Sequence, residues 1–230
     1  MFTLFTMSEQ REHILACACE LYLESGLDGF SMRKLAKQVG VTAPALYRHY
    51  DGREAVLMDV LRGAFAEFTR YIYRSLGAPT PLDRFFGAGD GYLDFVLEHP
   101  RWYSIIHTAP EALGIDSMPE DIEATGCAIH QFWNDRVREC MEAGILKPGD
   151  PGVTSITMWA HAHGLVQLYH HGQLRMGPDE FRKLFEVSSR RLMAGVATDE
   201  WVGEFSTRYA AQMVPIVTAK NEARNHVSPQ

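Results

Sequence analysis

Residues 30–50 read FSMRKLAKQVGVTAPALYRHY, and this stretch decides the fold. Ser31 can open a short helix, because its hydroxyl can accept hydrogen bonds from the first free backbone amides. Gly40 breaks that helix, and Thr42 can cap a second helix that runs to about His49. Two short helices joined by a glycine-containing turn form a helix-turn-helix, whose second helix can lie in the major groove of DNA.

The residue types within this stretch suit that motif. Leu35, Val41 and Leu46 are expected to supply the buried contacts that fix the angle between the two helices. The chain has a net charge of −7, yet the segment between Ser31 and Arg53 carries five basic residues and a single acidic one. A local basic patch on an acidic chain fits docking of one surface onto phosphates.

The rest of the chain also reads as helices. Nearly every segment repeats apolar residues three and four positions apart, and alternating runs of β-branched residues are scarce. The fold class is therefore predicted to be all-α, with about nine or ten helices. A first helix is expected from Ser8 to Gly26, and a long helix over about 52–74 follows a capping-box-like pair, Asp51 and Glu54. Later helices are expected at about 80–98, 100–109, 118–144, 151–175, 178–196 and 199–220.

Residues 9–60 resemble the DNA-binding domain of TetR-family repressors. In that family two aromatic residues three apart are followed by a basic residue, and Tyr47, Tyr50 and Arg53 occupy those places here. The alternatives that Tyr50 is a core residue and that His49 is merely exposed stay open. The resemblance implies phosphate contacts from Arg33, Thr42, Tyr47, His49, Tyr50 and Arg53, and base contacts from Ala43, Pro44, Ala45 and Arg48.

The second half carries a weaker resemblance. The run WAHAHG at 159–164 is similar to a Trp/His-Gly signature of one branch of TetR-like C-terminal domains. The family implies a homodimer through the helices at about 151–175 and 178–196, which would place two recognition helices about 34 Å apart. The expected organisation is a three-helix helix-turn-helix domain at 8–62, a ligand-binding and dimerisation domain at 63–222 and a polar tail at 223–230.

A ligand pocket is expected among the middle helices, where aromatic and polar residues interleave. Such a lining favours a mostly apolar ligand that is fixed by a few polar groups. Each aromatic residue is more often a core residue than a ligand wall, so the set describes a neighbourhood. The candidates are Phe86, Tyr92, Phe95, Trp102, Tyr103, Ile106, His107, Phe132, Trp133, Met158, His163 and Gln167.

The sequence therefore predicts a ligand-responsive, sequence-specific DNA-binding regulator. Its simplest form is a repressor that a small, largely apolar effector releases from a palindromic double-stranded DNA operator. An activator of the same fold is one alternative. Another is a metal-sensing regulator that uses the C-terminal histidines, although only His163 and His170 share a helix face and no cysteine or carboxylate stands at ligand spacing.

Other classes of protein are disfavoured. The chain has no phosphate-binding glycine loop, nucleophile elbow or paired-carboxylate signature, so neither an enzyme nor a cofactor is expected. No stretch approaches 18 uninterrupted apolar residues, and the first residues lack the features of a signal peptide, which predicts a cytoplasmic protein without a membrane segment. The four cysteines are expected to be small buried hydrophobic residues.

Overall fold

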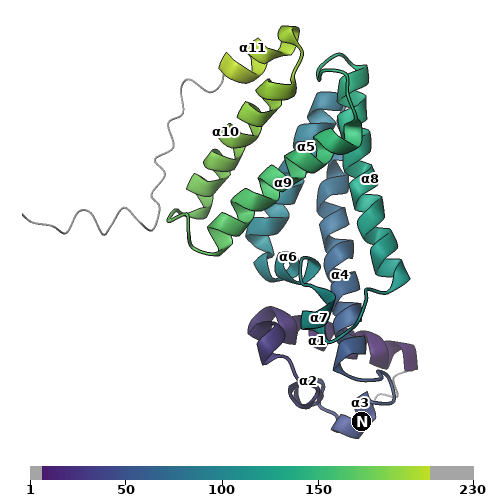
Figure 1. Cartoon of the computed structure of the whole chain (residues 1–230). Helices are drawn as coiled ribbons and strands as arrows, with labels where there is room; N and C mark the ends of the chain where they lie inside the picture. Colours follow the sequence, from purple (N-terminus) through teal and green to yellow (C-terminus); the bar gives the residue numbers. More distant parts are fainter. Residues whose placement is uncertain (1–6, 208–230) are drawn as a thin grey trace, which may run out of the picture. The chain divides into compact units, whose positions relative to one another are not determined.

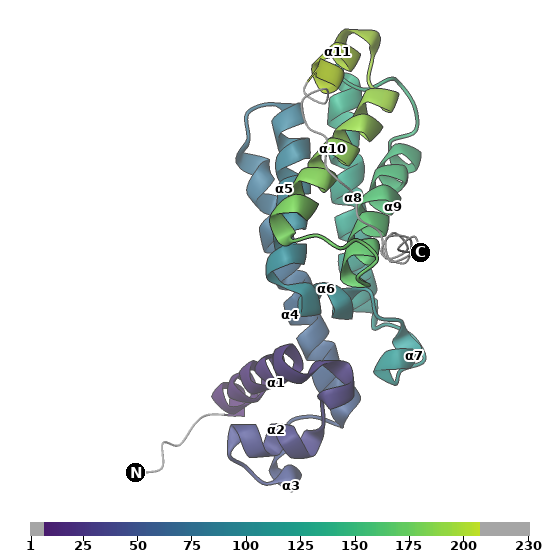
Figure 2. The same ribbon diagram turned by 90° about the vertical axis from the view of Figure 1, so that its left-hand side faces the viewer.

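The computed structural model describes residues 7–207, which form eleven α-helices and one short 3₁₀ helix (Figures 1 and 2). The β pairing within this range is an isolated bridge between Leu146 and Ala197. The all-α prediction is confirmed. The described chain divides into two compact units, one of residues 7–73 and 94–128 and the other of residues 74–93 and 129–207.

The first unit contains the helix-turn-helix. Its core is formed by buried leucines, and Leu35, Leu46, Leu57 and Leu61 are each 0% exposed. The prediction that Val41 is buried with Leu35 and Leu46 was wrong, because Val41 lies in the turn after Gly40 and is 40% exposed. Helices α1, α2 and α3 surround this core together with the start of α4 (Figure 2). The elements are α1 (Met7–Gly29), α2 (Met32–Val39), α3 (Ala43–Leu46), α4 (Arg53–Tyr73), α6 (Pro100–Ile106), α7 (Pro110–Leu113) and the facing ends of α5 (Pro81–Glu98) and α8 (Glu120–Glu142).

The second unit is a helical bundle. Its buried cluster includes Phe85 of α5, Val137 and Cys140 of α8, and Met193 of α10. Helices α9 and α10 pack side by side, as Figure 1 shows. The unit comprises the 3₁₀ helix η1 (Arg74–Gly77), the remaining parts of α5 and α8, α9 (Pro151–His170), α10 (Pro178–Val196) and α11 (Asp199–Thr207).

Several helix boundaries differ from those predicted. Gly26 adopts a positive φ of 67°, but a further helical turn extends α1 to Gly29. Helix α3 ends at Leu46 rather than near His49, and the one-turn helix α7 was not predicted. The last predicted helix begins at Asp199 as expected. Its part beyond residue 207 and the tail at 223–230 lie outside the described residues.

None of the helices within residues 7–207 combines the length and the apolar character needed to span a bilayer.

Candidate DNA-binding surface and ligand pocket

The turn between α2 and α3 is built by local capping. The hydroxyl of Ser31 accepts a hydrogen bond from the backbone amide of Lys34 at 3.3 Å, as the sequence predicts. Gly40 ends α2 with φ 79° and ψ 29°, a left-handed conformation that favours glycine, and its amide donates to the carbonyl of Ala36 at 3.0 Å. Thr42 has the extended backbone of a cap residue, but its side chain bonds no amide.

Helix α3 and the residues on either side of it present a surface of small, aromatic and basic side chains, which we call the α3 surface. Tyr47 is 54% exposed, although the adjacent Leu46 is fully buried. Arg33 of α2 is also exposed. Aromatic and basic side chains that are free of the core can reach a DNA backbone or groove. The α3 surface comprises exposed Thr42, Pro44, Tyr47 and Arg48 and half-buried Ala43, Ala45 and His49.

Tyr50 occupies a different position from Tyr47. Its side chain is only 3% exposed, and its hydroxyl donates to Asp59 Oδ2 at 3.0 Å. Burial, outweighing the opposing effect of Arg11, raises the pKa of Tyr50 to about 12. The hydroxyl therefore stays protonated and bonded inside the unit, and the phosphate contact expected for this side chain is not available to it here.

Asp59 joins three elements of the first unit. Besides Tyr50, its carboxylate accepts hydrogen bonds from Arg11 Nη2 of α1 at 3.0 Å and from Arg62 Nη1 of α4 at 2.8 Å. The Arg11 guanidinium also lies 5.0 Å from the centroid of the Tyr50 ring. This set of contacts fixes the segment that follows the α3 surface against both neighbouring helices.

Arg53 makes contacts within the protein. Its Nη2 donates to the carbonyl of Leu27 at 3.0 Å, and its Nε donates to the carbonyl of Phe30 at 3.4 Å. The half-buried Arg53 side chain thus ties the start of α4 to the segment between α1 and α2. The Arg53 guanidinium therefore satisfies two backbone carbonyls. It has further N–H groups, which could also contact a phosphate.

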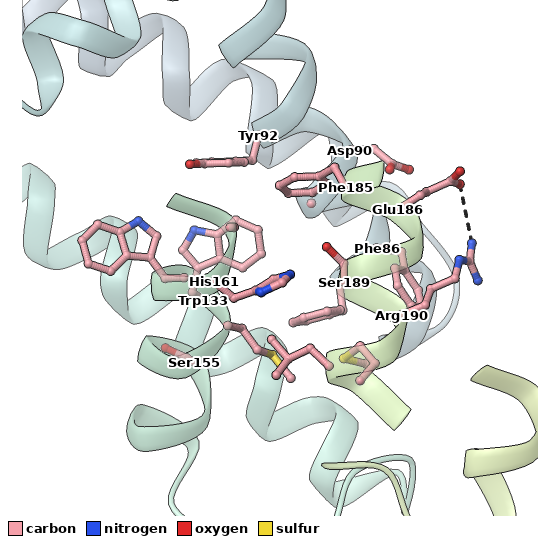
Figure 3. Close-up of a pocket in the computed structure, with 17 residues that line it drawn as sticks. Phe86, Asp90, Tyr92, Trp133, Ser155, His161, Phe185, Glu186, Ser189 and Arg190 are labelled. Carbon is pink, nitrogen blue, oxygen red and sulfur yellow. Dashed lines mark ion pairs between the residues drawn. The ribbon is translucent and has the colours of Figure 1, made fainter. Parts of the chain in front are cut away.

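The second unit contains a pocket of about 130 Å³ between α5, α8, α9 and α10 (Figure 3). Four of the predicted pocket residues line it, namely Phe86, Tyr92, Trp133 and Met158. The whole lining is Phe85, Phe86, Gly89, Asp90, Tyr92, Trp133, Ser155, Met158, Trp159, His161, Ala162, Phe185, Glu186, Ser189, Arg190, Leu192 and Met193.

The other predicted pocket residues lie away from this cavity. In the first unit, Phe95 packs on Phe68 with ring centroids 5.1 Å apart, and the rings of Tyr103 and His107 lie 4.3 Å apart. In the second unit, Phe132 lies 5.0 Å beneath the Arg136 guanidinium. The predicted residues that do not line the pocket are Phe95, Trp102, Tyr103, Ile106, His107, Phe132, His163 and Gln167.

Helix α10 supplies lining residues that were not predicted. Phe185, Ser189 and Met193 recur every four residues, as do Glu186 and Arg190, so they occupy one face of the helix. Arg190 pairs with Glu186 at 3.8 Å, and its guanidinium lies 5.1 Å from the Phe86 ring centroid. This spacing is present in the sequence, but the sequence predicts a dimerisation helix here and does not show which face of it lines a pocket.

The histidines of α9 do not form a metal site in the part of the chain that the structure describes. Within residues 7–207, no three histidine, cysteine, aspartate or glutamate side chains gather as metal ligands. His163 instead bonds Gln167, with its Nε2 3.2 Å from the amide nitrogen. Burial lowers the pKa of both His161 and His163. The metal-sensing alternative gains no support from these residues.

Two family models match the chain. One described as "Bacterial regulatory proteins, tetR family" matches residues 14–60, and one described as "Tetracyclin repressor-like, C-terminal domain" matches residues 85–192. Among curated proteins, the HTH-type transcriptional repressor KstR2 of Mycobacterium tuberculosis is 24% identical over 144 residues, covering 62% of this chain and 72% of the relative. The class C tetracycline repressor protein of Escherichia coli is 42% identical over 55 residues, covering 24% of this chain and 25% of its own length.

Solved structures share the fold over most of the chain. A protein of unknown function from Rhodococcus sp. RHA1 aligns with a TM-score of 0.70 at 24% identity, covering 82% of this chain and 96% of that one. The ketosteroid transcriptional regulator KstR2 of Mycobacterium tuberculosis aligns with a TM-score of 0.63 at 19% identity, covering 83% of this chain and 96% of that one. AibR, in a complex with isovaleryl coenzyme A and operator DNA, aligns with a TM-score of 0.58 at 18% identity. This alignment covers 82% of this chain and 98% of the AibR chain.

Proposed function

The chain belongs to the TetR family of bacterial regulatory proteins, and on that premise we propose that it is a repressor which a small, largely apolar effector releases from its operator. Its relatives are transcriptional regulators rather than enzymes. The observation that carries the proposal is the α3 surface, where the exposed Tyr47 and Arg48 directly follow α3, and Leu46 anchors that helix in the core. We place its action in the cytoplasm, where its operator would lie.

The proposed roles in DNA binding and effector binding are assigned to the two predicted domains. Residues 8–62 bind DNA, with Arg33 and the α3 surface making the contacts, while residues 63–222 bind the effector and the second subunit. Tyr50 and Arg53 act by positioning the α3 surface, because their side-chain bonds go to Asp59 and to backbone carbonyls. A groove-reading helix needs such fixed support, since misplacement would cost contacts to several phosphates at once.

The second subunit is proposed to dock on α9 and α10. Helix α9 exposes three large apolar side chains, with Val153 63% exposed, Ile156 45% and Leu168 40%. Apolar side chains gathered on one exposed helix are typical of a surface that another protein covers. Two copies related by a twofold axis would read a palindromic operator, each copy one half-site.

Effector binding releases DNA only if the effector prefers the state in which the two recognition helices do not match the groove. A preference of about 1.4 kcal/mol lowers operator affinity tenfold. Helix α6 packs directly against α4 in the first unit, so a shift of α6 is the proposed route to the helix-turn-helix. Structures with and without an effector test this route, and equal separation of the recognition helices in both would contradict it.

Selection of bound sequences from a random DNA pool tests the central proposal. The wild-type chain should enrich a palindrome, and native mass spectrometry should find two chains on each duplex. The double variant Tyr47→Ala, Arg48→Ala should lose enrichment while keeping its dimer mass and cooperative unfolding. The variant Lys147→Ala removes an exposed charge from the second unit and should enrich the same palindrome. A folded wild-type dimer that enriches no sequence would overturn the proposal.

A further inference from the structure

One polar atom in the pocket lacks a partner. The Nε2 atom of His161 is buried and makes no hydrogen bond within residues 7–207. The Ser155 hydroxyl, which also lines the pocket, has a partner, since its Oγ donates to Asn134 Oδ1 at 2.6 Å. Figure 3 shows the His161 ring extending from α9 into the pocket toward Ser189 of α10. Buried polar atoms without partners are rare in native proteins, so each one calls for a physical explanation.

The charges around the pocket disfavour an anionic ligand. Asp90 and Glu186 contribute two carboxylates, whereas Arg190 contributes one guanidinium. That guanidinium is already engaged by Glu186 at 3.8 Å and by the face of Phe86 at 5.1 Å. Burial lowers the pKa of His161, so its imidazole is neutral at neutral pH and adds no positive charge. The lining therefore carries one more carboxylate than guanidinium, which disfavours a ligand carboxylate.

The size and the walls of the pocket limit the ligand further. Aromatic side chains, among them Tyr92, Trp133 and Phe185, surround it (Figure 3). The pocket volume is about 130 Å³, close to the roughly 150 Å³ of an engineered apolar cavity that holds benzene. This volume matches a single six-membered ring, and flat rings pack well against aromatic walls.

We propose that His161 anchors the effector through Nε2, and that the effector is a compact, neutral, single-ring compound carrying one hydroxyl group. This inference rests on the proposed function of the pocket. A hydroxyl can donate or accept a hydrogen bond, so it satisfies Nε2 in either tautomer of the neutral imidazole. A ring without a polar group would leave Nε2 unsatisfied, and an ionised one would face the two carboxylates.

Binding of two matched probes tests the inference. p-Cresol and p-xylene have nearly the same shape and differ by a hydroxyl in place of a methyl group. Isothermal titration of the full chain without DNA should show p-cresol binding at least tenfold more tightly than p-xylene. The variant His161→Leu should bring the two affinities within about threefold of each other, because leucine keeps apolar volume but offers no hydrogen bond. The variant His171→Leu, at an exposed position after α9, should keep the wild-type preference.

A second measurement uses the wild-type chain alone. With ¹⁵N-labelled histidine, p-cresol should shift the Nε2 resonance of one histidine, and that resonance should be missing from His161→Leu. p-Xylene should leave it nearly unchanged, and p-toluate, the anionic analogue, should bind more weakly than p-cresol.

The inference would be overturned if the wild-type chain bound neither probe or bound both with equal affinity. An unchanged preference for p-cresol in folded His161→Leu would overturn it too, as would tighter binding of p-toluate than of p-cresol. Each can occur while the chain still enriches a palindrome from the DNA pool. Failure of this inference is therefore distinguishable from failure of the proposed function.

Discussion

The hydroxyl of Tyr50 donates a hydrogen bond to Asp59 Oδ2 at 3.0 Å, and this bond links the end of the helix-turn-helix to α4. The same oxygen also accepts from Arg11 of α1. Tyr47, three residues earlier, points away from the core and is 54% exposed. Two tyrosines of one motif thus have separate tasks, since one supports the α3 surface and the other belongs to it.

Replacing Tyr50 with phenylalanine should lower the free energy of unfolding by about 1.5–3 kcal/mol, because the ring stays packed and one hydrogen bond to a charged group is lost. Chemical denaturation measures this change. Tyr47→Phe, at an exposed position, is the matched control and should unfold like the wild type. If Tyr50→Phe kept full stability but lost operator binding, its hydroxyl would be a DNA contact after all.

Asp59 should make stability depend on pH in the acid range. Partial burial raises its pKa, but hydrogen bonds from Arg11, Tyr50 and Arg62 outweigh burial, so the net pKa is lowered. A carboxyl with a lowered folded-state pKa contributes stability above its unfolded pKa of about 3.9 and loses that contribution as the pH falls through the folded value. The stability gap between the wild type and Asp59→Asn should therefore be constant from about pH 5 to 7 and shrink below about pH 4.

Urea unfolding at a series of pH values measures this gap. Asp116→Asn alters an exposed carboxyl and serves as the control, with little change in stability at any pH. A stability difference between the wild type and Asp59→Asn that grew toward low pH would show that these hydrogen bonds do not stabilise the charged Asp59 carboxylate.

Gly40→Ala isolates the backbone requirement of the turn. Gly40 has φ 79°, and a Cβ added there would meet no other atom within 4 Å. The substitution should therefore cost only the left-handed strain, about 1–2 kcal/mol, and should lower Tm by a few degrees. Gly40→Asn should cost less, because asparagine tolerates this conformation. Equal Tm values for the wild type and Gly40→Ala would show that the turn adopts another backbone conformation.

The cysteines should react at very different rates. Cys127 is exposed, whereas Cys140 is buried and its burial raises its pKa to about 12. Burial also raises the pKa of Cys19 to about 11. Because the thiolate is the reactive form, N-ethylmaleimide at pH 7.5 should modify Cys127 first, and peptide mass spectrometry identifies the site. Cys127→Ser should abolish the fast reaction, and fast labelling of Cys140 in the native protein would contradict its position in the core.

Local features of this fold could be predicted from the sequence, because caps and turns depend on a few neighbouring residues. The Ser31 cap and the Gly40 turn are of this kind, and the prolines at 81, 100, 151 and 178 mark helix starts. The one-turn α7 escaped prediction, since four residues show no apolar period. The prediction that all four cysteines are buried was wrong for Cys127, because an exposed helix face tolerates a small thiol.

The candidate functional residues also differ in whether neighbouring residues or distant segments determine them. The candidate DNA-binding surface at residues 30–53 could be predicted from neighbouring residues alone. The burial of Tyr50 could not, because it depends on where α1 and α4 lie. The pocket depends entirely on packing between distant segments. Aromatic residues such as Phe95 and Phe86 look alike in the sequence, and only the folded chain separates a core ring from a lining ring.

The composition of α3 has a consequence for how an operator would be distinguished. The three residues that begin this helix, Ala43, Pro44 and Ala45, carry only hydrocarbon side chains. In the major groove such groups recognise the C5 methyl of thymine, which uracil lacks. An operator that contains uracil in place of thymine keeps every hydrogen-bonding edge, so any affinity it loses measures the hydrocarbon contribution alone. Because 5-methylcytosine carries the same methyl group, base contacts from these three residues would make base methylation within the half-site a signal that the helix could detect.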